Sequence, residues 1–358
     1  MRRSARRTGC LLGVAILGLS LLTALFFAAY TPEPRPLRVA AWMPTSWDAE
    51  RARTSWLANR HLIDELSPVW YQVGAAGDGS LVRYSGACDA TLITEAHDSG
   101  VLVLPLVNNA YGGVFDPAPV SAVLHDPALR AAHITVLVDE VLACGYDGVD
   151  IDYESLGGMA DREAFSLFVE ELAAALHAQG RLLAVTVHPK TAEPGNWAGP
   201  QAQDWARIGA AADRLRVMAY GYHWEGSGPG PIAPLFWMED VVRFARRQVE
   251  PHKVYLGLHL YALDWSAAGT TARTWEGVQP LAAAPGAERQ WVDQQGWRQT
   301  VAEPRLAYTA DGVQHEVWYA DGTSIAVRLS MVRRYGLGGV AFWRLGGEDP
   351  ACWTALSN

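Results

Sequence analysis

The chain has 358 residues, of which 50% are hydrophobic and 19% are charged, and its formal net charge is −9. The apolar content excludes an intrinsically disordered protein, and the length allows one large domain or two ordinary ones. The acidic balance argues against nucleic acid as a partner, because acidic surfaces repel a phosphate backbone.

The first thirty residues predict export of the rest of the chain. Four arginines precede a run of 25 uncharged residues that ends at Pro32. Residues 9–30 are long enough to cross a bilayer as a helix, and the arginines place the remainder of the chain outside. We expect residues 1–30 to be an anchor that holds the chain at the cell membrane. A cleaved signal peptide is the alternative, and the main domain would then be secreted.

Residues 31–36 are predicted to be a short linker, and residues 37–356 form the main domain. Eight apolar runs alternate with helical patterns along it, at 37–43, 68–73, 101–107, 146–153, 182–188, 214–220, 253–261 and 336–343. Nearly continuous apolar runs are typical of parallel strands that are covered on both faces. The alternation predicts the α/β class and, within it, a (β/α)8 TIM barrel.

One connection is too long for a single βα unit. Seventy-four residues separate Tyr261 from Gly336, and they include the turn dipeptides Asp311-Gly312 and Asp321-Gly322. Turn dipeptides between β-like runs indicate hairpins. We predict a small α+β insertion between strands 7 and 8, within residues 262–335, that forms one wall of a groove.

Three cysteines lie beyond the N-terminal segment, at positions 88, 144 and 352. One disulfide is possible in an exported domain, but the spacing does not choose the pair. Buried unpaired thiols are an equally good interpretation.

Three acidic residues, Asp150, Asp152 and Glu154, alternate along the fourth apolar run. Alternate strand residues point to one side, which in a barrel is the interior. The run leads into a loop at the carboxyl end of the strand, where active sites of this fold lie. Neighbouring carboxylates raise one another's pKa, as a general acid requires. An acidic loop or a calcium site is the alternative, but no further ligand pattern supports either.

The segment DGVDIDYE, from Asp147 to Glu154, resembles the DxxDxDxE signature of glycoside hydrolase family 18, the chitinase-like (β/α)8 enzymes. The similarity continues at MAYGYHW (218–224), GLHLYALDW (257–265) and GLGGVAFWRLG (336–346). These segments are most similar to those of the bacterial spore-germination, cortex-lytic branch of the family. Members of that branch act on N-acetylglucosamine linkages in peptidoglycan.

The resemblance implies a retaining hydrolase that uses the substrate's own 2-acetamido oxygen as nucleophile, with no cofactor and no metal. Glu154 would protonate the leaving oxygen, and Asp152 would hold the acetamido N–H. Asp150 would share a proton with Asp152, and Tyr220 would donate its hydroxyl to the acetamido oxygen. Trp343 would support the sugar ring with its flat apolar face.

Further residues are candidates for substrate contacts because they lie near the predicted mouth of the barrel. They are Asp147, Met218, His223, Trp224, Asn108, Tyr71 and Tyr261. Each has a structural alternative. Asp147 and Asn108 could hold strand ends or turns, and the others could pack in the barrel or under loops.

One position departs from the family pattern. Gly221 stands where the sixth-strand motif usually has an aspartate that contacts the sugar near the cleavage point. Its absence should weaken positioning of the sugar. A catalytically weak or inactive, lectin-like envelope protein is therefore the alternative function.

The sequence as a whole predicts an envelope-bound glycosidase. It would cleave β-1,4 linkages in polysaccharides or oligosaccharides that contain N-acetylglucosamine, with peptidoglycan as first choice and chitin as second. The membrane, through residues 9–30, would be its other partner.

Overall fold

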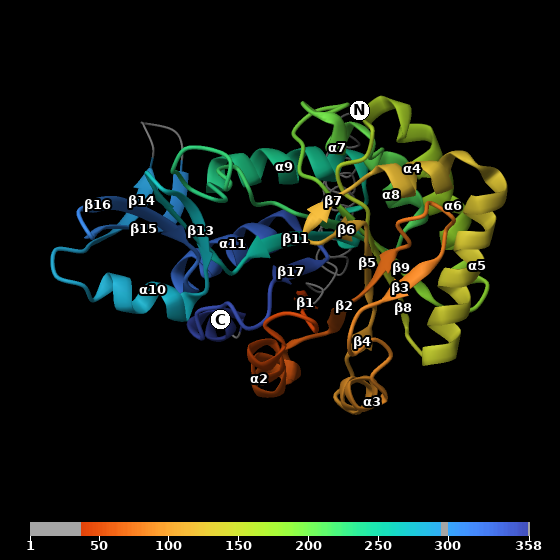
Figure 1. Cartoon of the computed structure of the whole chain (residues 1–358), viewed down its shortest axis with the longest axis horizontal. Coiled ribbons are helices and arrows are strands. Elements are labelled where there is room, and N and C mark those ends of the chain that lie inside the picture. Colours follow the sequence, from red (N-terminus) through yellow and green to blue (C-terminus); the bar gives the residue numbers. More distant parts are fainter. Residues whose placement is uncertain (1–36, 295–299, 357–358) are drawn as a thin grey trace, which may run out of the picture. The chain divides into compact units, whose positions relative to one another are not determined.

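The computed structural model describes residues 37–294 and 300–356 (Figure 1). The predicted membrane anchor and the linker after it lie outside these residues. Within the two described ranges, no helix is both long and apolar enough to cross a bilayer.

Eight parallel strands close into a barrel, and each overlaps one of the eight predicted runs. They are β1 (Arg38–Met43), β2 (Glu65–Val73), β5 (Leu106–Asn108), β8 (Gly148–Asp152), β9 (Leu182–Val187), β10 (Arg214–Val217), β11 (Val254–His259) and β17 (Gly339–Trp343). The barrel closes where β1 pairs with both β17 and β2. The predicted (β/α)8 barrel is confirmed.

Helices connect the strands and cover the barrel. They are α2 (Ala49–Asn59), α3 (Ala90–Asp98), α4 (Ala118–His125), α5 (Pro127–Cys144), α6 (Arg162–His177), α7 (Ala198–Gln201), α8 (Trp205–Ala211), α9 (Leu235–Gln248), α11 (Gly322–Tyr335) and α12 (Ala351–Leu356). Short 3-10 turns occur at Arg60–Leu62, Gly158–Ala160 and Pro251–Lys253. Helix α6 buries Phe165, Phe168 and Leu172 at helical spacing.

The long connection between β11 and β17 forms a separate antiparallel sheet. Its strands are β12 (Ala262–Ser266), β13 (Gly269–Arg273), β14 (Glu288–Gln294), β15 (Thr300–Ala310) and β16 (Val313–Tyr319), with α10 (Trp275–Ala282) beside them. This is the α+β insertion expected between the seventh and eighth barrel strands. Four short strands lie elsewhere: β3 (Leu81–Arg83), β4 (Leu102–Val103), β6 (Ala110–Tyr111) and β7 (Val114–Phe115).

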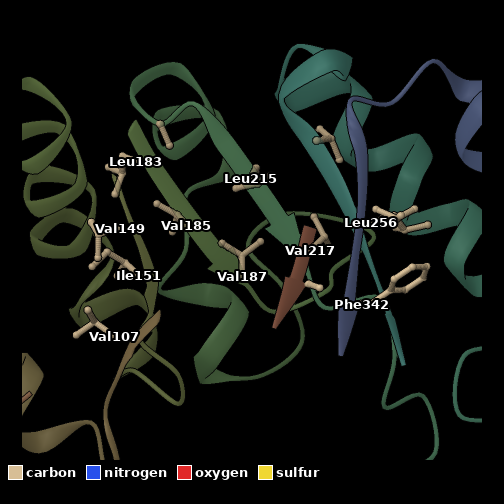
Figure 2. Close-up of a cluster of buried hydrophobic side chains, with 14 of the residues drawn as sticks. Val107, Val149, Ile151, Leu183, Val185, Val187, Leu215, Val217, Leu256 and Phe342 are labelled. Carbon is tan, nitrogen blue, oxygen red and sulfur yellow. The ribbon is translucent and has the colours of Figure 1, made fainter. Parts of the chain in front are cut away.

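The two faces of the barrel strands differ in character. Figure 2 shows one layer of apolar side chains from neighbouring strands, including Val149, Ile151, Val185 and Val217. Successive strand residues point to opposite faces, so the residues that alternate with these point into the barrel. Those interior positions on β8 include Asp150 and Asp152, and Asp152 lies at the carboxyl end of the strand.

The structure pairs Cys88 with Cys144, which joins the loop after β3 to the last residue of α5. The two residues are 56 apart in sequence, and their Cα atoms lie 5.6 Å apart. Cys352 is buried and free.

Reduction of this disulfide is expected to lower the free energy of unfolding by about 2–4 kcal/mol, because the unfolded chain regains the freedom of a long closed loop. Denaturant titrations with and without reductant measure the change. The same unfolding midpoint with and without reductant would contradict the expectation.

Candidate active site

Glu154 stands two residues beyond the end of β8, and Asn109 fixes its backbone. The Asn109 side chain donates to the Glu154 carbonyl at 2.9 Å and accepts from the Glu154 N–H at 2.8 Å. Asn109 is buried and comes directly after β5, the strand next to β8. The neighbouring strand therefore sets the position of the acidic residue at the barrel mouth.

Asp150 is fully buried in the barrel interior and accepts three hydrogen bonds. The indole N–H of Trp42 donates at 2.8 Å, the Thr186 hydroxyl at 2.9 Å and the Arg216 guanidinium at 2.7 Å. These donors fix the position of the Asp150 side chain. Among the described residues no hydrogen bond joins it to Asp152, so the sharing of a proton between them stays a prediction.

Asp152 and Glu154 favour their protonated forms. Burial raises the pKa of Asp152 well above its usual range, and the nearby charges of Glu154 and Asp150 raise it further. Burial raises the pKa of Glu154 to about 8. The Oδ1 atom of Asp152 is buried and has no hydrogen-bond partner in the described part of the chain. The site therefore offers a proton donor, Glu154, just beyond the strand and an unfilled oxygen, Oδ1 of Asp152, at the end of the strand.

His188, at the end of β9, lies beside Glu154 without forming an ion pair. Its Nε2 atom is 3.7 Å from the Glu154 carboxylate and accepts the Ser155 N–H at 3.3 Å. Burial lowers the pKa of His188 to about 4, so the ring is neutral at physiological pH. A neutral histidine leaves the raised pKa of Glu154 uncompensated.

Tyr220 lies just after β10 and stands among aromatic rings next to the carboxylates. Its ring centroid is 6.3 Å from that of Tyr261 and 6.5 Å from that of His259. Burial raises the pKa of Tyr220 well above its usual value, and the charges of Glu154 and Asp152 add to the effect. The hydroxyl therefore keeps its proton and can donate it in a hydrogen bond.

Trp343 ends β17 and lines a cavity of about 480 Å³. The other lining residues include Trp47, Trp224, Tyr261, Arg273 and Arg344. Trp224 is 59% exposed and Trp47 is 42% exposed, which is unusual for such large apolar side chains. The inserted sheet supplies one wall of this cavity through Arg273 and its neighbours. Trp343, Trp224 and Tyr261 are thus brought together, as three faces on which sugar rings can rest.

Two predicted contacts lie elsewhere and are corrected. Asp147 precedes β8, and its carboxylate accepts the Val103 N–H at 2.8 Å and contacts His97 at 2.9 Å. It lies at the amino end of the strand, whereas the site lies at the carboxyl end. Tyr71 is buried, and its hydroxyl bonds Glu140 and Tyr146, both at 2.6 Å. Since Glu140 belongs to α5, Tyr71 points out of the barrel.

Three further candidates lie near the mouth but have structural contacts. The Asn108 side chain accepts from the Tyr84 hydroxyl at 3.2 Å and from the Ala110 N–H at 3.1 Å, which caps a turn. His223 donates to the Pro231 carbonyl at 2.9 Å and packs under the loop that carries it. Met218 is buried directly after β10.

Sequence reasoning missed the charged centre of the barrel. Arg216 is fully buried and pairs with Glu65 at 2.9 Å and with Asp150 at 2.7 Å. Tyr255 also donates to Glu65, at 3.0 Å. The signal that could have found it was the pair of arginines at alternate positions, 214 and 216, in an apolar run, which places both on the interior face.

The raised pKa of Glu154 predicts how stability depends on pH. A group whose pKa is higher in the folded state contributes stability below its unfolded pKa, near 4.5, and loses it as the pH rises through about 8. Glu154→Gln removes this titration. We expect its melting temperature to exceed that of the wild type by a margin that widens from pH 5 to pH 9, with a free-energy difference of a few kcal/mol.

Thermal unfolding of both proteins across that pH range measures the margin. A margin that is constant or narrows with pH would show that Glu154 is ionised in the folded protein at neutral pH.

Comparison with known proteins identifies the family. The model for glycosyl hydrolases family 18 matches residues 99–348. YdhD of Bacillus subtilis, assigned as a sporulation-specific glycosylase, is 31% identical over 302 residues, which cover 82% of this chain and 70% of that protein. The cortical fragment-lytic enzyme of the same organism is 28% identical over 273 residues, which cover 74% of this chain and 61% of that enzyme.

Solved structures agree with this assignment. The crystal structure of a chitinase from Chromobacterium violaceum has a TM-score of 0.80 at 28% identity, and the match covers 90% of this chain and 98% of that one. The resemblance to the cortex-lytic branch is confirmed by the two Bacillus relatives. The chain belongs to glycosyl hydrolase family 18 and is a glycosidase.

Proposed function

We propose that the chain hydrolyses the β-1,4 linkage on the reducing side of N-acetylglucosamine, with retention and with the substrate's acetamido group as nucleophile. The observation that carries the proposal is the buried, unfilled Oδ1 acceptor of Asp152 beside a protonated Glu154. Buried polar atoms of folded proteins are normally hydrogen-bonded, so an unfilled one in a site suggests a ligand donor. The N–H of a 2-acetamido group is a donor of the required kind.

In the first step the acetamido oxygen bonds to the anomeric carbon as the bond from that carbon to the leaving oxygen breaks. The proton of Glu154 passes to the leaving oxygen, which departs as a hydroxyl. The acetamido N–H, held by Asp152, shares the positive charge of the oxazolinium ring. Tyr220 donates its hydroxyl to the acetamido oxygen and aligns it.

In the second step water attacks the anomeric carbon from the side that the leaving group vacated. The Glu154 carboxylate takes the proton of the water, and the ring opens to restore the acetamide. Two inversions give net retention, and Glu154 ends the cycle protonated, as it began. Trp343 supports the sugar ring during both steps.

Peptidoglycan is the proposed polymer and chitin the second choice. The similarity to a cortical fragment-lytic enzyme and to a sporulation-specific glycosylase supports peptidoglycan. The Cys88–Cys144 pair supports an oxidising location outside the cytoplasm, as the predicted export through residues 9–30 requires.

A matched pair of substrates tests the mechanism. Chito-oligosaccharides and cello-oligosaccharides share the β-1,4 linkage, but only the former carry the 2-acetamido group. We expect hydrolysis of chitotetraose with the β-anomer formed first, as seen by proton NMR, and no hydrolysis of cellotetraose. Comparable cleavage of both, or an initial α-anomer, would overturn substrate assistance.

A further inference from the structure

A second cavity has a volume of about 470 Å³. Its lining includes Trp197 from the loop after β9, Gly221 and Tyr222 from the loop after β10, and Trp237 of α9. Tyr220 lies between residues of the two cavities: its ring packs edge-on against Tyr261, which lines the first cavity, and the next residue, Gly221, lines the second. The volume falls within the range of small-molecule sites.

One side chain, His188, separates Trp197 of the second cavity from Glu154. The Trp197 ring meets the His188 ring edge-on at 4.6 Å, and His188 lies 3.7 Å from the Glu154 carboxylate. Trp197 is 45% exposed and Tyr222 is 42% exposed, so both offer open aromatic faces next to the cavity. Such faces suit the apolar sides of sugar rings.

Gly221 leaves open space next to the predicted acetamido clamp. Its φ is +80°, and apart from Gly221 and its two chain neighbours no atom lies within 4 Å of the position that a Cβ would occupy. Any side chain at this position would project into that space. Residues other than Tyr220 and Tyr222 therefore leave the space at Gly221 open.

The charged groups of this cavity are already paired. Lys190 is buried and contacts Glu193 at 2.9 Å, and it also donates to the Gln203 carbonyl at 2.5 Å. Selectivity in this cavity is therefore expected to come from space and stacking rather than from a free charge.

Peptidoglycan differs from chitin by a bulky group on the leaving sugar, which requires space near the scissile bond. The scissile oxygen is O4 of the leaving sugar, and in peptidoglycan the sugar next to N-acetylglucosamine on its reducing side is N-acetylmuramic acid. In N-acetylmuramic acid the carbon next to C4, which is C3, carries a lactyl ether. In chitin the C3 of the leaving sugar carries only a hydroxyl. A bulky group must then fit directly beside the scissile bond, on the side of the leaving sugar.

We propose that the cavity lined by Trp197, Gly221 and Tyr222 binds the leaving sugar, and that Gly221 admits a lactyl ether at its C3. The inference rests on the proposed function, in which Trp343 holds the N-acetylglucosamine ring in the first cavity. Gly221 then determines specificity for muramic acid, rather than marking a weakened site.

The test compares Gly221→Asn with the wild type on two tetrasaccharides. One is chitotetraose, and the other alternates N-acetylglucosamine with N-acetylmuramic acid and has no stem peptides. Asparagine tolerates positive φ better than other side chains and fills the open space. We expect the ratio of kcat/KM for the muramic substrate to that for chitotetraose to fall by about tenfold or more.

Gly145→Asn is the matched control. Gly145 also has a positive φ, +72°, with no atom near its Cβ position, but it ends α5 at the far end of the barrel. It should leave the ratio unchanged. Thermal unfolding of each variant reports whether it is folded.

Trp197→Ala provides an independent result should Gly221→Asn fail to fold. Loss of a stacking face is expected to lower kcat/KM for both tetrasaccharides by about tenfold. An unchanged ratio in folded Gly221→Asn, or full activity of Trp197→Ala on both substrates, would overturn the inference. A wild type that cleaves neither tetrasaccharide would instead overturn the proposed function itself.

Discussion

Glu154→Gln is expected to lower kcat/KM for chitotetraose and for peptidoglycan fragments by about 10²–10⁴-fold, the usual contribution of a general acid. Glutamine keeps the shape of the side chain and the backbone clamp from Asn109, but it has no proton to give to the leaving oxygen. Oligosaccharide binding should persist. Steady-state kinetics and titration calorimetry measure the two quantities separately.

Asp147→Asn is the matched control for this prediction. It removes a carboxylate from the same sequence motif, but at the opposite end of β8, where the side chain holds Val103 and His97. We expect it to keep catalytic activity and to lose some stability. Similar losses of activity in both variants would show that the motif acts as a structural unit.

The pH dependence of kcat/KM reports the same acid. Activity requires Glu154 to be protonated in the free enzyme, so the rate should fall on the alkaline side of a pKa near 8. Because Asp152 lies beside it, the measured pKa belongs to the pair rather than to either residue alone.

Arg216→Met is expected to lower the free energy of unfolding by about 3–5 kcal/mol at pH 7. This is the largest loss of stability that we predict for a single substitution. Arg216 is fully buried and pairs with Glu65 and Asp150, which are also fully buried. Without it two carboxylates remain inside the barrel with too little positive charge, although Arg214 still contacts Glu65 at 2.8 Å. Denaturant titration measures the loss.

Arg38→Met is the control, since Arg38 also pairs with an aspartate, at 3.2 Å from Asp64, but is 52% exposed. Exposed ion pairs contribute about 0–1 kcal/mol, so this variant should unfold almost as the wild type does. Equal losses in the two variants would mean that the buried pairing does not hold the barrel together.

The barrel and its carboxylates could be predicted because both result from local patterns. Continuous apolar runs mark buried parallel strands, and each of the eight runs overlaps a barrel strand. The alternation of Asp150 and Asp152 places them on the interior face of β8. Each apolar run and the alternation of the acidic residues can be recognised within one strand, so no knowledge of distant contacts is needed.

The charged core could not be predicted because it joins distant strands. Arg216 is 151 residues from Glu65 and 66 from Asp150, and only closure of the barrel brings them together. The same holds for Trp42, whose indole reaches Asp150 over 108 positions. Choosing such partners requires the register between strands.

Tyr71 shows how a local irregularity defeats the alternation rule. Val69 packs in an interior cluster, so Tyr71, two residues later, should point inward too. The pairing of β2 with β5 shifts register between these two residues. A bulge of this kind reverses the side to which later residues point, and Tyr71 faces α5 instead. Periodicity alone gives no sign of it.

The most direct test of the central claim is the chemical identity of the ends that the full chain creates in purified peptidoglycan. Products are reduced with borohydride and analysed by mass spectrometry, with Glu154→Gln as the blank. We predict new ends that carry reduced N-acetylglucosamine and that are absent from the blank. New ends that carry reduced N-acetylmuramic acid, or no new ends from peptidoglycan while chitotetraose is cleaved, would contradict the account.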